Sequence, residues 1–151
     1  VSKSKNIDFS IYEAYFGDEK NIEIIEKDNI YETIKMCKVA LAASGTITLQ
    51  LALMKIPMCV FYKISFLTYL IAKLLVKINF ISLANIVMGE KIVNEFIQNQ
   101  ANEKNLSYEI IKLIEDENYK QSMIQNFIFL EKKLKDEPSK ISIDDLIYKM
   151  L

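Results

Sequence analysis

The chain has 151 residues, 51% hydrophobic and 26% charged, a balance that suits a folded domain with a buried core. Nineteen basic and twenty acidic residues leave a formal net charge of -1, so the composition favours no nucleic-acid partner. Histidine is absent, which excludes histidine-dependent catalytic triads and most zinc sites. We expect no metal and no cofactor.

The amino terminus and the most apolar stretch both argue against membrane insertion. Residues 1–6 lack the charged and apolar regions of a signal peptide. Residues 66–81 are the most apolar, but lysine and asparagine interrupt them well short of the ~20 apolar residues that a spanning helix needs. The cysteines, Cys37 and Cys59, have no C-x-x-C spacing and suit buried thiols in a reducing cytoplasm.

Short apolar runs alternate with helical patterns through the first part of the chain. The expected strands are residues 22–25, 38–43, 58–62 and 80–83. The expected helices between them are residues 29–37, 47–55 and 65–76. Strands that alternate with helices are typical of an α/β fold, in which helices cover both faces of a parallel sheet.

From about residue 92 onward the pattern indicates helices alone. They are expected at residues 92–98, 103–116, 118–135 and 143–151. One of them has apolar side chains at helical spacing, which predicts a buried face: Tyr119, Met123, Phe127, Leu130 and Leu134. We therefore expect one domain over residues 1–151, with residues 103–151 as a helical carboxyl-terminal extension.

The strongest local signal is the turn Ser44-Gly45-Thr46, between an expected strand and an expected helix. Gly45 allows a ligand to approach the backbone, and the first amides of a helix attract anions. The hydroxyls of Ser44 and Thr46 add donors, so the turn can bind phosphate. An ordinary helix cap has the same residues, and that interpretation stays open. The turn matches neither G-x-G-x-x-G nor G-x-x-x-x-G-K-[ST], which argues against a dinucleotide enzyme or a P-loop NTPase.

A longer ordered set of residues, which begins at this turn, resembles the carboxyl-terminal domain of the lipid-A-disaccharide synthase family. The resemblance covers roughly residues 21–112. It is carried by Ala43-Ser44-Gly45-Thr46, Leu49, Ile56-Pro57-Met58, Tyr62-Lys63, Ser65, Leu67-Thr68-Tyr69, Ala72-Lys73, Val76-Lys77, Ile81-Ser82-Leu83, Asn85, Gly89, Val93, Glu95 and Gln98.

The resemblance implies a glycosyltransferase with two Rossmann-like domains that face a cleft, the GT-B arrangement. Its carboxyl-terminal half holds the nucleotide-sugar donor, and this chain resembles that half. The donor would be UDP-2,3-diacylglucosamine and the acceptor 2,3-diacylglucosamine 1-phosphate, joined to form a β-1,6-linked disaccharide. The acceptor would bind through an amino-terminal half that this chain lacks, and that half would supply the general base.

The same resemblance assigns the donor site to Ser44, Gly45, Thr46, Gln50, Asn85 and Glu95. Gln50 stands where the family usually has a glutamate, so it accepts a hydrogen bond without the strength of a charge. Asn85 would position the donor, although a structural loop asparagine is the alternative. Glu95 is either a donor-site residue or the solvated carboxylate of a helix.

The acylated substrates imply an enzyme in the cytoplasm, peripheral to the inner membrane and in contact with its surface, and the family context suggests a homodimer. For residues 65–78 we prefer core packing to an interfacial helix. The alternative function is a non-catalytic remnant or interaction module that keeps the fold. Gln50, the acidic Glu90 near a usual arginine, and the absent amino-terminal half motivate that alternative.

Overall fold

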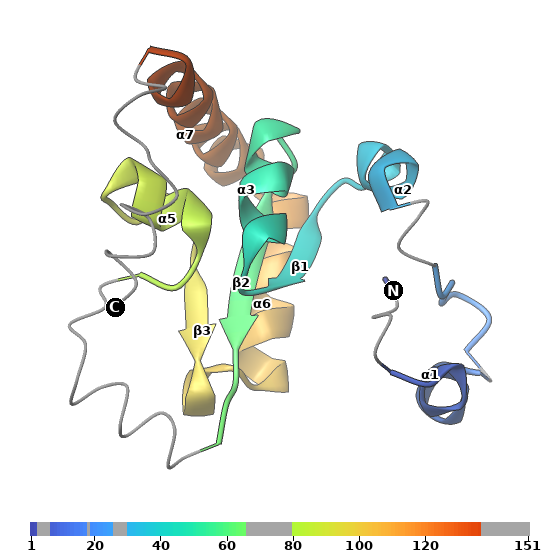
Figure 1. Ribbon diagram of the computed structural model, residues 1–151. Helices are drawn as coiled ribbons and strands as arrows, with labels where there is room; N and C mark the ends of the chain where they lie inside the picture. The colour runs from blue at the N-terminus through green and yellow to red at the C-terminus, as the bar shows by residue number, and fades with distance from the viewer. Residues whose placement is uncertain (3–6, 18, 26–29, 66–79, 137–151) are drawn as a thin grey trace. The chain divides into compact units, whose positions relative to one another are not determined.

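A computed structural model describes residues 1–2, 7–17, 19–25, 30–65 and 80–136 (Figure 1). The chain divides into two compact units, Val1–Cys37 and Lys38–Leu151. All candidate site residues, from Ser44 to Glu95, belong to the second unit. The helices predicted at residues 65–76, apart from Ser65, and 143–151 lie outside the described residues. One domain over residues 1–151, with its extension, stays a prediction.

The first unit contains two helices in its described part. α1 spans Phe9–Phe16 and α2 spans Ile30–Met36, and α2 confirms the helix predicted at residues 29–37. α1 begins where the carboxylate of Asp8 accepts a hydrogen bond from the Ser10 N–H at 2.9 Å. This is an ordinary amino-terminal cap, because a side-chain oxygen satisfies one of the N–H groups left unpaired in the first turn.

The strand predicted at residues 22–25 is wrong. Only Ile25 pairs, in an isolated parallel bridge with Ser2, in which the Ile25 N–H donates to the Val1 carbonyl at 2.8 Å. The terminal ammonium of Val1 also donates to the Glu23 carbonyl at 2.6 Å. A single bridge does not form a ladder, so the β-branched composition of this segment was not enough to form a strand.

The second unit contains a three-stranded parallel sheet in the order β1-β2-β3. β1 spans Ala40–Ala43, β2 spans Met58–Tyr62 and β3 spans Glu95–Ile97. In register, Leu41 is opposite Cys59, and Phe61 is opposite Phe96. β1 and β2 confirm the strands predicted at these positions. The described residues thus form an α/β fold of the Rossmann-like kind.

Helices cover both faces of the sheet. α3, at Thr46–Leu53, and α5, at Leu83–Met88, lie on one face, whereas α6, at Glu103–Glu115, lies on the other (Figure 1). α7, at Glu117–Asp136, packs against α3, α5 and α6. The predicted helices at residues 47–55, 103–116 and 118–135 are confirmed. Each parallel strand pair is joined through helical crossovers, as parallel topology requires.

The core lies between the central strand and the helices. β2 contributes fully buried residues, as do α6 and α7. Burial of each large apolar side chain stabilises the fold by about 1.5–3 kcal/mol. The buried face predicted for α7 is confirmed, since its central residues are buried and its outer two are half-buried. The largest fully buried apolar side chains are Phe127, Met58, Leu113, Leu130, Val60 and Val93.

One buried carboxylate connects α6, α7 and the entrance to β3. Glu109 accepts hydrogen bonds from the Tyr119 hydroxyl at 2.6 Å and from Asn94 Nδ2 at 2.8 Å. Burial and the neighbouring Glu109 raise the pKa of Tyr119 above its usual range. Burial also raises the pKa of Cys59 to about 12, so this thiol stays protonated and unreactive at neutral pH.

The helix predicted at residues 92–98 is wrong, because this segment contains β3. The Val60 N–H donates to the Asn94 carbonyl at 2.9 Å, and β2 then pairs with Glu95–Ile97. The segment is short, and its apolar residues fit a strand as well as a helix. Here the segment is a strand because it pairs with the edge of β2 that β1 leaves free.

The strand predicted at residues 80–83 is also wrong, because α5 begins there. The Ser82 hydroxyl caps α5 by accepting from the Asn85 N–H at 3.3 Å. The Ile81 and Ser82 N–H groups donate to the Glu95 side chain instead of to a neighbouring strand. In the described part of the chain no helix has both the length and the apolar character of a bilayer span.

An ion pair holds the end of α3 to α7. Lys55 Nζ lies 2.5 Å from Glu131 Oε2, and Lys135 Nζ lies 2.6 Å from the other oxygen of the same carboxylate. The hydrogen bonds from Lys135 and Lys55 lower the pKa of Glu131 from its usual 4.5 to about 2. The ionised carboxylate therefore favours the folded state.

We predict that Glu131→Gln destabilises the protein at neutral pH and that the difference from wild type shrinks in acid. Because the folded pKa is lowered, the contribution of Glu131 is fully present above pH 4.5 and is lost as the pH falls toward 2. Urea unfolding at pH 7 and pH 3 measures this. The control is Glu115→Gln, an exposed carboxylate without an ion pair among the described residues. A difference for Glu131→Gln that stays the same at both pH values contradicts the prediction.

Candidate functional site

The loop between β1 and α3 is the centre of the candidate site. Gly45 is the residue before α3, with φ 134° and ψ -166°, and no side chain caps this helix. A Cβ placed on Gly45 would meet no described atom within 4 Å. The first turn of α3 therefore has N–H groups that no side chain caps, and the helix dipole favours an anion at this end. The predicted strand, small-residue turn and helix are all present.

The two hydroxyls of the loop differ in their surroundings. Ser44 is turned toward the protein, since its hydroxyl donates to the Ile81 carbonyl at 3.4 Å and its N–H to the Phe61 carbonyl at 3.2 Å. Thr46 is exposed, and its hydroxyl has no hydrogen bond with a described residue. Thr46 is thus the better-placed hydroxyl donor for a ligand.

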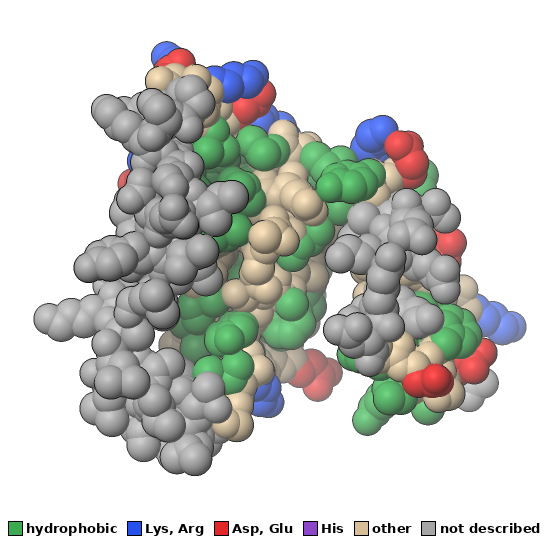
Figure 2. Space-filling view, in the orientation of Figure 1, with side chains coloured by type: hydrophobic (Ala, Val, Ile, Leu, Met, Phe, Trp, Pro, Cys, Tyr) green, Lys and Arg blue, Asp and Glu red, His purple; other side chains and the backbone are tan. Residues whose placement is uncertain are grey.

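Charged side chains are scarce on the described surface near α3. Figure 2 shows apolar and uncharged side chains over this face, with lysines and carboxylates gathered toward its margins. An anion at the loop would therefore depend on backbone amides and hydroxyls more than on lysine. Gln50, one turn further along α3, is half-buried and uncharged as well.

Asn85 is fully buried in α5, and its amide is saturated by hydrogen bonds within the protein. Nδ2 donates to the Val93 carbonyl at 3.0 Å and to Glu95 Oε1 at 2.8 Å. Oδ1 accepts from the N–H groups of Ile92 and Val93 at 2.8 and 2.9 Å. A buried amide can make four such bonds, and all four are present. A ligand could bind this side chain only by displacing one of them.

Glu95 extends from β3 to the start of α5. Its carboxylate accepts from the Ile81 N–H at 2.9 Å, from the Ser82 N–H at 2.8 Å and from Asn85 Nδ2. These bonds hold the residues that precede α5, where a helix would otherwise leave unpaired N–H groups. Glu95 is on a strand, so the alternative of a solvated helix carboxylate is wrong.

The structure brings the predicted residues together through the segment Ile81–Asn85. Ser44 binds this segment from the loop, and Glu95 binds it from β3. Two further residues join them that were not predicted to belong to the site. Thr48 Oγ1 accepts from the Leu83 N–H at 3.1 Å, and Ser82 caps α5. Both residues are fully buried. The Thr48 hydroxyl has a partner 35 residues away, whereas the Ser82 hydroxyl has a local one in Asn85.

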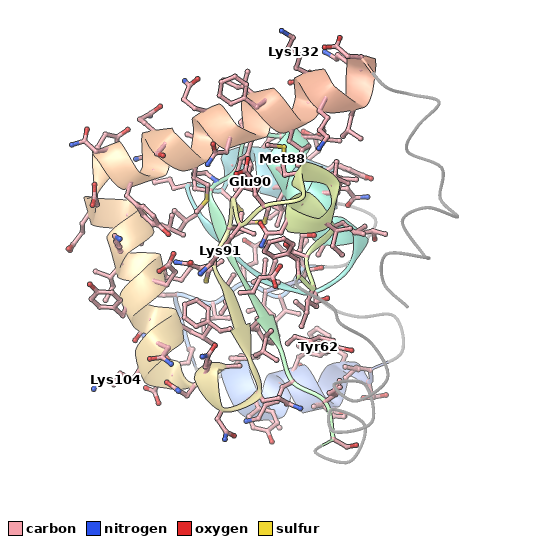
Figure 3. All side chains as sticks on the ribbon, turned by 90° about the vertical axis from the view of Figure 1, so that its left-hand side faces the viewer. Tyr62, Met88, Glu90, Lys91, Lys104 and Lys132 are labelled. Carbon is pink, nitrogen blue, oxygen red and sulfur yellow. The ribbon has the colours of Figure 1, made fainter. Side chains whose placement is uncertain are left out.

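The far end of α5 is also fixed. Figure 3 shows Met88, Glu90 and Lys91 along the connection that leaves α5 toward β3. Lys133 Nζ of α7 donates to the Met88 carbonyl at 3.0 Å, which satisfies a carbonyl at the helix end.

Gln98, just after β3, binds both the N–H and the carbonyl of Ile64, each at 3.2 Å. The side-chain amide of Gln98 thus links the residues that follow β2 and β3.

This arrangement defines the class of the protein: a Rossmann-like α/β domain with an open, uncapped glycine loop at the carboxyl end of a strand, where such folds bind nucleotides. The sequence matches the family model for lipid-A-disaccharide synthetase over residues 1–144, and the chain belongs to this family.

Individual relatives agree with the family match. The chain is similar to lipid-A-disaccharide synthase of Nitrosococcus oceani, at 38% identity over 71% of this chain and 28% of the relative. It is 52% identical to the Acinetobacter baylyi protein of the same name, over 56% of this chain and 22% of that protein. Lipid-A-disaccharide synthase 1 of Legionella pneumophila is 34% identical over 89% of this chain and 35% of its own length. The chain thus spans about a third or less of these relatives.

We predict that Gly45→Ala lowers the free energy of unfolding by about 1–3 kcal/mol, because the backbone conformation at this position is essentially restricted to glycine. Steric contact adds nothing, since the space around the missing Cβ is open. The matched control is Gly89→Ala, also in open space but in the left-handed conformation, which should lose about 1 kcal/mol. Urea unfolding measures the free energy of unfolding of both variants and of the wild type. If Gly45→Ala is as stable as wild type, the loop does not have this conformation.

Proposed function

We propose that this chain provides the nucleotide-sugar-binding part of a lipid-A-disaccharide synthase. The observation that carries the proposal is the uncapped start of α3 at Gly45, open to an anionic ligand. A diphosphate that accepts hydrogen bonds from the Thr46 and Ile47 N–H groups and the Thr46 hydroxyl would satisfy donors that have no partner among the described residues. Family membership supports a UDP-sugar as the source of that diphosphate.

In the proposed reaction, the acceptor hydroxyl of 2,3-diacylglucosamine 1-phosphate attacks the anomeric carbon of UDP-2,3-diacylglucosamine. The bond from that carbon to the diphosphate breaks, UDP leaves with the electron pair, and a base removes the hydroxyl proton. The loop amides stabilise the charge that develops on UDP, because they are already oriented and need no rearrangement. Ser44 and Gly45 shape the loop, and Gln50, one turn later on the same helix, is proposed to bind the ribose.

Asn85 and Glu95 serve this site indirectly in our proposal. Their hydrogen bonds hold Ile81–Asn85 beside the loop, and neither side chain needs to touch the donor. The acceptor and the base belong to the remaining two thirds or more of the relatives' length. Product formation from both substrates, measured with that part of a relative supplied, tests this division. The acylated substrates support contact with the cytoplasmic surface of the inner membrane, and homodimerisation stays a prediction.

We predict that the folded chain binds UDP with a dissociation constant below about 1 mM and binds uridine at least tenfold more weakly, because the loop recognises the diphosphate. Thr46→Pro removes two of the proposed donors: the side-chain hydroxyl, and the N–H at the first position of α3, where proline suits a helix. It should weaken UDP binding by at least about tenfold, because each hydrogen bond lost to a charged group costs about 1.5–3 kcal/mol. Isothermal titration calorimetry measures the affinity of the wild type for UDP, its affinity for uridine, and the affinity of Thr46→Pro for UDP.

The matched control is Glu103→Pro, the same substitution at the first position of α6. It should leave UDP affinity unchanged, because α6 lies on the opposite face of the sheet from α3 (Figure 1). Absence of UDP binding in a folded sample would overturn the proposal. If UDP and uridine bind with equal affinity, the loop does not recognise the diphosphate, and that part of the proposal is wrong.

A further inference from the structure

Thr48 connects the candidate loop to the start of α5 through one buried hydroxyl. Its Oγ1 donates to the Gly45 carbonyl at 2.8 Å and accepts from the Leu83 N–H at 3.1 Å. The Thr48 side chain is fully buried. A threonine in a helix often bonds to the carbonyl three residues earlier. Here the same oxygen also accepts from a residue 35 positions away, so it fixes both helix starts at once.

The Gly45 carbonyl is held by two donors, both from Thr48. Besides the hydroxyl, the Thr48 N–H donates to this carbonyl at 3.2 Å. The peptide bond that follows Gly45 is trans, so its carbonyl and the Thr46 N–H lie in one plane and point in opposite directions. With the carbonyl held toward α3, the Thr46 N–H points away from the helix.

We propose that Thr48 is a positioning residue that orients the Thr46 N–H toward the diphosphate of the nucleotide. This rests on the proposed function, in which the loop binds that diphosphate. Glycine on its own would leave the peptide plane freer to rotate, because it has the widest choice of backbone conformations. The Thr48 hydroxyl restricts that rotation, and the bond from Leu83 restricts the hydroxyl.

Three variants separate this role from a general effect on stability. Thr48→Val keeps the shape of the side chain and removes the hydroxyl, Thr48→Ser keeps the hydroxyl, and Tyr119→Phe removes a hydroxyl that bonds to the buried Glu109. We expect UDP affinity to fall about five- to tenfold in Thr48→Val, to stay within about twofold of wild type in Thr48→Ser, and to be unchanged in Tyr119→Phe. Calorimetry gives the affinities, and thermal unfolding confirms that each sample is folded.

The outcomes distinguish this inference from the function on which it rests. If wild type fails to bind UDP, the proposed function fails. If wild type binds and Thr48→Val binds equally well, the positioning role of Thr48 is overturned while the function stands. An equal loss in Tyr119→Phe also overturns it, since that residue is outside the loop. Should Thr48→Val not fold, Thr48→Ala is measured against the same criteria.

Discussion

The hydrogen bonds that Glu95 makes with Asn85 and with the backbone of residues 81–82 are the constraint on which the candidate site depends. Glu95 is fixed by its place in β3, and Asn85 by its burial in α5. Together they hold a segment that would otherwise have unpaired N–H groups. In the described residues no buried side-chain polar atom lacks a partner, so this network is fully satisfied and rigid.

Much of the fold could be predicted from local pattern. β2 is a continuous apolar run of strand length. α6 and α7 have long apolar faces that a helix can bury on one side. β3 could not be predicted, because three residues have no distinctive periodicity and the edge of β2 determines their pairing. At the site, Gly45 was found from its local sequence. The hydrogen bonds of Asn85 and Glu95 could not be predicted, because they join segments that are distant in the sequence. The same is true of the bond between Thr48 and Leu83.

The network also supports the proposed binding of an anion at a weakly charged surface. Fixed amides at a helix start need no nearby lysine, provided that the loop does not relax away from the ligand. Ser44, Thr48 and Glu95 meet that condition from three different elements or loops. Gln50 is uncharged, so its proposed hydrogen bond to the ribose is weaker than that of a carboxylate. The contacts with the diphosphate would therefore contribute the larger part of the proposed affinity. Binding and fold stability should therefore depend on the same few polar side chains.

The unfolding free energy of Asn85→Asp tests this account most directly. The substitution preserves shape but replaces Nδ2 with an oxygen that faces the Val93 carbonyl and the Glu95 carboxylate. We predict a loss of about 3 kcal/mol at pH 7, from repulsion and from unsatisfied buried groups. Adding Glu95→Gln should recover part of it by removing one charge. An Asn85→Asp protein as stable as wild type would contradict the account.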